Sequence, residues 1–340
     1  MKTLIKVLFI SLSLVTVYLH YLNNISSQIQ QDLYKDIGTG NFRESSTARF
    51  NVLDLDYPNI SLTALPMKGL VARYLYLGAR YEEALELLNA SKNDNPFIMY
   101  NESLKQDIYY KLEVQDSVVY YAEKAFTGLP NNQKHFIDLA RAYSSYKDDK
   151  NYYKIDSIFK KVENTDVYQI WKFYFASVLT NESLISDYAK EKALYVLENF
   201  KDVADEQLYL SAKYTINGKE NIDKSLSLEK EGIQLFVEER YREAALIFEQ
   251  AYSFDNTEYL HLENAAICNY KFGYYDRALP QLNSVIDAHS PKTGQSEFIL
   301  AKIYFENKEF DNACEFIRKS AAYEFRESYK FIGEYCSSLN

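Results

Sequence analysis

Three small residues in the last third of the sequence recur at an interval of 34 or 35 residues. Ala244, Ala278 and Ala313 each lie in a segment whose large apolar residues fall at helical spacing. The clearest of these segments, residues 228–256, is predicted to form a helix, a tight turn and a second helix. A period of this length built from two amphipathic helices indicates a solenoid, because one helix pair buries its apolar face only against neighbouring pairs.

The same interval appears in the N-terminal half of the chain. Pro96 and Pro130 are 34 residues apart, and each follows a predicted helix, which proline ends. This pattern resembles the tetratricopeptide repeat (TPR) family. The resemblance implies an all-α, helix–turn–helix superhelical solenoid. We count about seven repeats, with a break after the fourth, behind one N-terminal transmembrane helix.

Composition agrees with a helical chain and limits the classes of partner. The 340 residues include only 6 prolines and 10 glycines, which leaves few places for hairpins. Tyrosine is unusually frequent, with 32 residues, and tyrosine serves both helix packing and binding surfaces. A net charge of −10 argues against nucleic acid as a partner of the whole chain.

Residues 1–23 open with Lys2 and Lys6 and then become apolar, so that residues 4–22 can enter a membrane. Bulky Tyr18, His20 and Tyr21 stand where a signal peptidase prefers small residues, which favours an uncleaved signal anchor over a cleaved signal peptide. Cleavage remains the alternative. Positive charge on the N-terminal flank predicts that the body lies outside the cytoplasm, in the periplasm if the source is bacterial.

The rest of the chain divides into four predicted segments. Residues 24–64 form a connector whose first part can extend the membrane helix. The first TPR array occupies residues 65–203, and residues 204–223 hold an extra helix followed by a turn at 217–221. The second array and a capping helix occupy residues 224–340.

The family resemblance also implies which residues face a binding groove, because the first helix of each repeat (helix A) lines the inner surface. In the first array these positions hold Arg73, Tyr76, Tyr100, Asp107, Tyr110, Lys134 and Arg141. In the second array they hold Glu229, Ile233, Phe236, Glu263, Lys271, Phe298, Lys302 and Phe305. Aromatic residues beside Arg or Lys are typical of peptide-binding grooves, although aromatic stripes at helical spacing also pack helices together.

Catalytic and cofactor signals are lacking in the sequence. The four histidines are scattered, and no nucleophile elbow, zinc-protease or phosphate-loop motif occurs. We therefore expect no enzyme activity, no cofactor and no metal site. Cys268, Cys314 and Cys336 lack zinc-site spacing, and the sequence leaves open whether Cys314 and Cys336 form a disulfide.

These features favour a non-enzymatic, membrane-tethered scaffold that binds partner proteins in an extracytoplasmic assembly, such as an envelope, secretion or surface-polysaccharide system. Two alternatives stay open. A tyrosine-rich groove also suits a glycan-binding module, and a scaffold of this kind can be an accessory subunit of a membrane enzyme complex. The identity of the partner, the pathway and the oligomeric state do not follow from the sequence.

Overall fold

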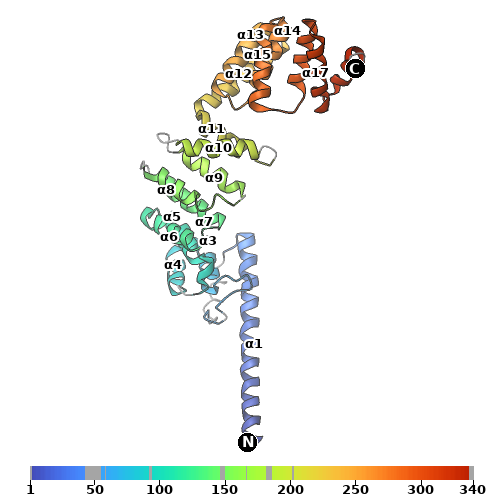
Figure 1. The fold of residues 1–340 in the computed structure, drawn as a ribbon. Coiled ribbons are helices and arrows are strands. Elements are labelled where there is room, and N and C mark those ends of the chain that lie inside the picture. The colour runs from blue at the N-terminus through green and yellow to red at the C-terminus, as the bar shows by residue number, and fades with distance from the viewer. Residues whose placement is uncertain are drawn as a thin grey trace. The chain divides into compact units, whose positions relative to one another are not determined.

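A computed structural model describes residues 2–42, 55–57, 59–91, 94–145, 150–165, 167–180, 186–200 and 203–336. Regular structure in these ranges is helical apart from an isolated bridge between Ile60 and Pro66 (Figure 1). The prediction of an all-α, TPR-type solenoid behind a long apolar helix is confirmed. The chain forms two compact units, Met1–Leu184 and Ile185–Asn340, called here the N-terminal and C-terminal units.

The N-terminal unit contains one long helix followed by helix pairs. Its elements are α1 (Lys2–Thr39), α3 (Met67–Leu77), α4 (Tyr81–Ala90), η1 (Pro96–Ile98), α5 (Tyr100–Lys111), α6 (Gln115–Gly128), α7 (Gln133–Ser144), α8 (Lys150–Phe159) and α9 (Tyr168–Leu179). α3 packs on α4, α5 on α6, and α7 on both α6 and α8, which is the arrangement of a helical solenoid.

The C-terminal unit continues the pattern and ends in a short cap. Its elements are α10 (Asp187–Asn199), α11 (Glu206–Asn217), α12 (Lys219–Val237), α13 (Tyr241–Phe254), α14 (Tyr259–Phe272), α15 (Tyr275–His289), α16 (Gln295–Glu306), α17 (Phe310–Ala322), α18 (Arg326–Phe331) and η2 (Ile332–Cys336). Each helix from α10 to α17 packs on the next one along the chain.

Two boundaries differ from the sequence prediction. The turn predicted at residues 217–221 is wrong beyond Gly218, because Lys219 already begins α12. Gly218 has a φ of 82°, so a single residue reverses the chain where five were expected. The compact units also divide between residues 184 and 185, so α10 belongs to the C-terminal unit, whereas the predicted first array continues to residue 203.

A single left-handed residue forms the turn inside five of the repeats. The residues at this position are Ala79, Glu113, Glu239, Gly273 and Lys308, with φ values between 57° and 89°. In each turn, this residue and the next donate their backbone N–H groups to carbonyls three and five residues earlier, respectively. The repeat therefore keeps its length by backbone geometry, and glycine occupies the position only once.

Small residues permit close contact between the two helices of a pair, as the sequence predicts. Ala244, Ala278 and Ala313 are fully buried. A Cβ atom added to Gly232 would lie 2.8 Å from the ring of Phe248, so α12 and α13 approach closely only because this side chain is missing.

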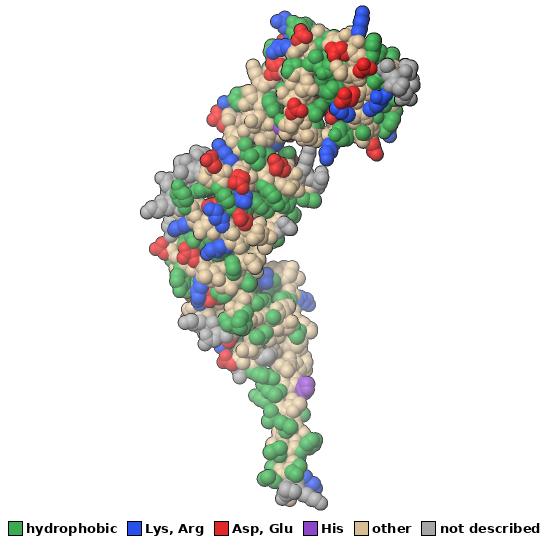
Figure 2. Space-filling view, viewed as in Figure 1, with side chains coloured by type: hydrophobic (Ala, Val, Ile, Leu, Met, Phe, Trp, Pro, Cys, Tyr) green, Lys and Arg blue, Asp and Glu red, His purple; other side chains and the backbone are tan. Residues whose placement is uncertain are grey.

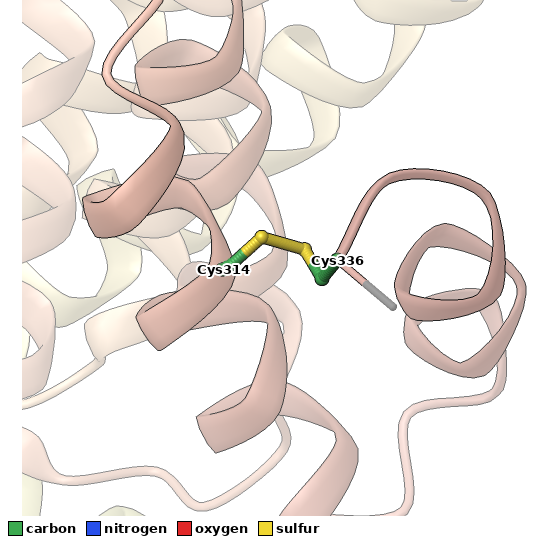
Figure 3. The surroundings of a disulfide bond; sticks show 2 residues. All are labelled: Cys314 and Cys336. Carbon is green, nitrogen blue, oxygen red and sulfur yellow. A yellow bond between two sulfur atoms is a disulfide. The ribbon is translucent and has the colours of Figure 1, made fainter. Parts of the chain in front are cut away.

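The C-terminal cap is covalently attached. Cys314 of α17 and Cys336 of η2 form a disulfide with their Cα atoms 5.7 Å apart (Figure 3). The sequence left open whether these two cysteines are bonded, and the structure shows that they are. Cys268 is a free, fully buried thiol in α14, and burial raises its pKa to about 12.

The long helix α1 has two parts in different surroundings. From Leu4 to Tyr21 its large apolar side chains are exposed, several by more than 60%, and Figure 2 shows them in green along the N-terminal segment. Ile29 and Leu33, further along, are buried in a cluster with Leu70 and Tyr74 of α3. α1 is long and apolar enough to cross a membrane.

Candidate functional site

A pocket of about 520 Å³ opens on the N-terminal unit between the chain preceding α3 and the helices α3, α5 and α7. It is lined by Thr63, Leu65, Arg73, Tyr76, Leu77, Ile98, Tyr100, Ser103, Leu104, Asp107, Asn132, Lys134 and His135. Three successive A helices therefore contribute to one site. Five residues that the family resemblance assigns to a groove meet in it: Arg73, Tyr76, Tyr100, Asp107 and Lys134.

Lys134 connects α7 to α5 on one side of this pocket. Its Nζ atom donates to Ser103 Oγ at 2.9 Å and lies 3.2 Å from Asp107 Oδ2, and it also pairs with Asp138. Burial raises the pKa of Asp107, while the charge of Lys134 opposes this increase. Lys134 thus balances two carboxylates and holds neighbouring repeats in register.

Tyr100 and Arg73 form the opposite side of the pocket. The hydroxyl group of Tyr100 is buried and has no hydrogen-bond partner of good geometry. Burial raises the pKa of Tyr100 to about 12, and the nearby guanidinium of Arg73 partly offsets this effect. Among the residues that the structure describes, Arg73 takes part in no ion pair, whereas Lys134 takes part in two. The pocket therefore offers the Arg73 guanidinium to a ligand, while the Tyr100 hydroxyl is closed to solvent beside it.

Two predicted groove residues of the first array lie outside the pocket lining. Tyr110, near the end of α5, is 51% exposed. The guanidinium of Arg141 lies 5.4 Å from the ring centre of Phe173 and 3.8 Å from Asp138 Oδ1. Arg141 therefore contacts α9 and its own helix.

In the second array, two of the predicted residues, Phe236 of α12 and Lys271 of α14, contact each other. The ammonium of Lys271 lies 5.7 Å from the ring centre of Phe236 and 5.4 Å from that of Tyr241. The Phe236 and Tyr241 rings are themselves 5.5 Å apart across the intra-repeat turn. These side chains join one repeat to the next by cation–π contacts.

The next repeat has similar cation–π contacts and also packs against the C-terminal cap. Lys302 lies 5.7 Å from the ring centre of Phe298 and 5.2 Å from that of Tyr270. The ring of Phe305 lies 4.6 Å from that of Tyr335 in η2 and 5.3 Å from that of Phe331 in α18. Phe298 and Phe305 thus pack against the residues that close the solenoid.

Several pocket residues were not predicted from the sequence. Thr63 comes from the connector, where no repeat pattern assigns positions, and Leu65 is the first residue of the predicted first array. His135 is buried, burial lowers its pKa, and its Nδ1 atom has no hydrogen-bond partner. Repeat spacing identifies its neighbour Lys134 as a groove residue but gives no groove position to residue 135.

The described residues also contain a serine–histidine pair that spacing did not reveal. Ser225 Oγ lies 2.9 Å from Nε2 of His261, and both side chains are at most 1% exposed. The hydroxyl also donates to the carbonyl of Ala251. Because the pair is closed to solvent, it connects α12, α13 and α14 and offers no accessible nucleophile. No group of three metal-binding side chains lies within the ranges that the structure describes.

No protein-family model and no curated protein matches the sequence. Among solved structures, a tetratricopeptide repeat protein from Parabacteroides merdae is 13% identical, with a TM-score of 0.32 over 90% of this chain and 96% of its own. The TPR2AB domain of yeast Sti1 in complex with pHSP90 is 14% identical, with a TM-score of 0.30 over 77% and 92%. The C-terminal part of a TPR repeat-containing protein from Cytophaga hutchinsonii is 15% identical, with a TM-score of 0.29 over 77% and 98%. The fold of this chain is assigned from its own helices.

Proposed function

We propose that the protein is a non-enzymatic, membrane-tethered scaffold that binds a partner protein through the pocket of its N-terminal unit. The observation that carries this proposal is the meeting of Arg73, Tyr76, Tyr100 and Lys134, from three successive A helices, in one pocket. Such a scaffold acts by adhesion, and it holds its partner in an extracytoplasmic assembly of the envelope, secretion or surface-polysaccharide type.

The chemistry of the pocket suits a polypeptide segment. Leu65, Leu77 and Ile98 supply apolar contacts, and the Arg73 guanidinium supplies a charged one. Aromatic and arginine side chains contribute most of the affinity at protein interfaces. An extended segment that carries an acidic residue among aliphatic ones would satisfy both sets of contacts.

Two further features support the tether and its orientation. The exposed apolar side chains from Leu4 to Tyr21 would be covered by lipid, and Lys2 and Lys6 would remain on the cytoplasmic side. The Cys314–Cys336 disulfide is of the kind that persists in oxidising compartments outside the cytoplasm.

Affinity capture with the full-length protein in detergent tests the proposed function. Arg73→Glu should abolish capture of a specific protein that the wild type recovers. Lys111→Glu, a matched charge reversal at the end of α5 outside the pocket lining, should leave capture unchanged. Equal recovery by both variants would contradict the assignment of the pocket.

A glycan remains the second candidate ligand, because Tyr76 and Tyr100 lie beside polar Asp107 and Asn132 in the same pocket. Aromatic faces next to hydrogen-bonding groups can stack on sugars. Titration with a panel of oligosaccharides, followed by intrinsic tyrosine fluorescence, separates the two. A response that Tyr76→Ala removes would favour the glycan.

A further inference from the structure

The helix α1 and the pocket of the N-terminal unit share a wall. Gln30 Oε1 accepts a hydrogen bond from the backbone N–H of Leu62 at 3.1 Å, and the hydroxyl groups of Tyr34 and Thr63 are 2.7 Å apart. Thr63 lines the pocket. Tyr34 is also close enough to Tyr100 to affect its pKa. The pocket is thus built directly against the helix that leaves the apolar segment.

This contact is extensive enough to fix α1 against the first repeat. Ile29 is 7% exposed and Leu33 is 1% exposed, both in the cluster formed with α3. Ser26 and Gln30, on the same side of α1, are also buried and hydrogen-bond to each other. Burial of two large aliphatic side chains contributes about 3–5 kcal/mol, so α1 is part of the N-terminal unit.

No flexible joint separates the apolar and packed parts of α1. The helix is continuous from Lys2 to Thr39, and the sequence has neither glycine nor proline between residues 2 and 37. Thirteen residues separate Tyr21, at the end of the exposed apolar segment, from Tyr34 beside the pocket. At the helical rise per residue, this distance is about 20 Å.

We infer that the partner bound in this pocket is itself a membrane protein, and that the bound segment lies close to the bilayer surface. The inference rests on the proposed function and extends it, because a rigid stalk of about 20 Å holds the pocket at a fixed height. A segment that emerges from the membrane on a neighbouring protein reaches this height within a few residues. Its acidic side chain would pair with Arg73.

Site-specific photo-cross-linking in cells, with full-length protein, tests the inference. Benzoylphenylalanine replaces Tyr110, an exposed residue near the end of α5 outside the pocket lining, in three versions of the protein. One has the natural helix, and two carry seven or eleven helix-forming residues between Asn23 and Asn24. These insertions add about two and three turns, so they raise the pocket by about 10 and 16 Å while keeping the orientation of its face.

The natural helix should give an adduct with a protein that resists carbonate extraction, and both insertions should remove that adduct. A seven-residue insertion after Lys292, between α15 and α16, serves as the control and should leave the adduct unchanged. Protease resistance of the N-terminal unit establishes that the lengthened proteins are folded. Because two insertion lengths are used, the test can still be read if one of the lengthened proteins misfolds.

The possible failures are distinguishable. An adduct that persists in the folded, lengthened proteins, or whose partner is a soluble protein, would overturn the inference and leave the proposed function intact. No adduct in any version, or a protein that is absent from the membrane fraction, would refute the proposed function together with the inference.

Discussion

The N-terminal and C-terminal units place similar residues of helix A in different environments. In the N-terminal unit, Arg73, Tyr76 and Tyr100 line a pocket. In the C-terminal unit, Lys271 lies over Phe236 and Lys302 lies over Tyr270, in each case on the preceding repeat. Equivalent repeat positions therefore line a pocket in one unit and join repeats in the other.

The difference follows from what lies beside each helix A. In the C-terminal unit, a lysine about one repeat further along reaches the aromatic ring of the previous repeat, and Phe331 and Tyr335 of the cap cover Phe305. In the N-terminal unit, Lys134 instead turns toward Asp107 and Asp138. A lysine that pairs with carboxylates leaves the neighbouring rings uncovered, and a pocket remains.

The largest destabilisation is expected at α11, the extra helix of the C-terminal unit. Lys213 of α11 is 8% exposed and pairs with Asp255 at 3.1 Å and Glu258 at 2.7 Å. Lys213→Met should lower the free energy of unfolding of this unit by about 3–5 kcal/mol, because it leaves the buried Asp255 and the partly buried Glu258 without their cation. Urea denaturation followed by circular dichroism measures the change.

Lys219→Met is the control, since its partner Asp223 and Lys219 itself are both exposed, and it should cost at most about 1 kcal/mol. Burial lowers the pKa of Lys213, but the carboxylates of Glu258 and Asp255 raise it by more, so that this pKa lies above its usual value. The ion pairs of Lys213 therefore stabilise the folded unit fully at neutral pH, and this stabilisation is lost only as pH rises above the usual lysine range. Equal effects of the two substitutions would contradict this account.

Removing the disulfide should expose the covered aromatic residues of the C-terminal unit. Cys314→Ser with Cys336→Ser should lower the free energy of unfolding by about 3 kcal/mol, because the bond closes a loop of 22 residues. Loosening of the cap should also free Phe298 and Phe305 and increase the binding of a hydrophobic dye. Cys268→Ala, which removes the free thiol, should not increase dye binding.

Glycine-to-alanine substitutions compare close helix contacts in the two units. Gly232→Ala should cost about 1–3 kcal/mol by forcing a methyl group against Phe248. At Gly69, where an added Cβ would lie 3.1 Å from the ring of Tyr100, the cost should be smaller, but partner capture should also fall as the ring shifts. Gly38→Ala, with nothing nearby, should not destabilise the protein in thermal denaturation, because alanine is favoured over glycine in a helix.

The smallest effect concerns the left-handed turns, which are the same in both units. Glu239 and Ala79 have φ values of 61° and 59°. Replacement of either by glycine should stabilise its repeat by about 0.5–1 kcal/mol, because glycine adopts this conformation without steric cost. Glu238→Gly, at a φ of −77°, should instead destabilise the protein. Differential scanning calorimetry measures whether each substitution raises or lowers the stability of the protein.

Repeat spacing predicts the helix pairs well because it depends on small residues such as Ala244 and Ala278, whose role is local and periodic. The same spacing places Arg73, Tyr76, Tyr100, Asp107 and Lys134 on helix A and thereby finds five of the thirteen residues that line the pocket. It does not find Thr63, which hydrogen-bonds to Tyr34 of α1, or Leu65, which lies just before α3.

Spacing also does not separate binding residues from packing residues. Phe298 and Phe305 follow the same pattern as Tyr76, and only the position of the C-terminal cap distinguishes them. That position depends on contacts between residues about 20 apart, such as Cys314 and Cys336, which a helical period does not encode. The turn at Gly218 is predicted, but as five residues, because the positive φ that lets one glycine make the turn has no periodic signal.

Paired substitutions test the central claim most directly, namely that helix A binds a partner in the N-terminal unit and stabilises repeats in the C-terminal unit. Arg73→Ala with Tyr76→Ala should abolish partner capture at a cost of about 1 kcal/mol or less in unfolding free energy. Phe298→Ala with Lys302→Ala should cost about 3 kcal/mol and leave capture intact. Loss of capture by the second pair, with full capture by the first, would contradict the account.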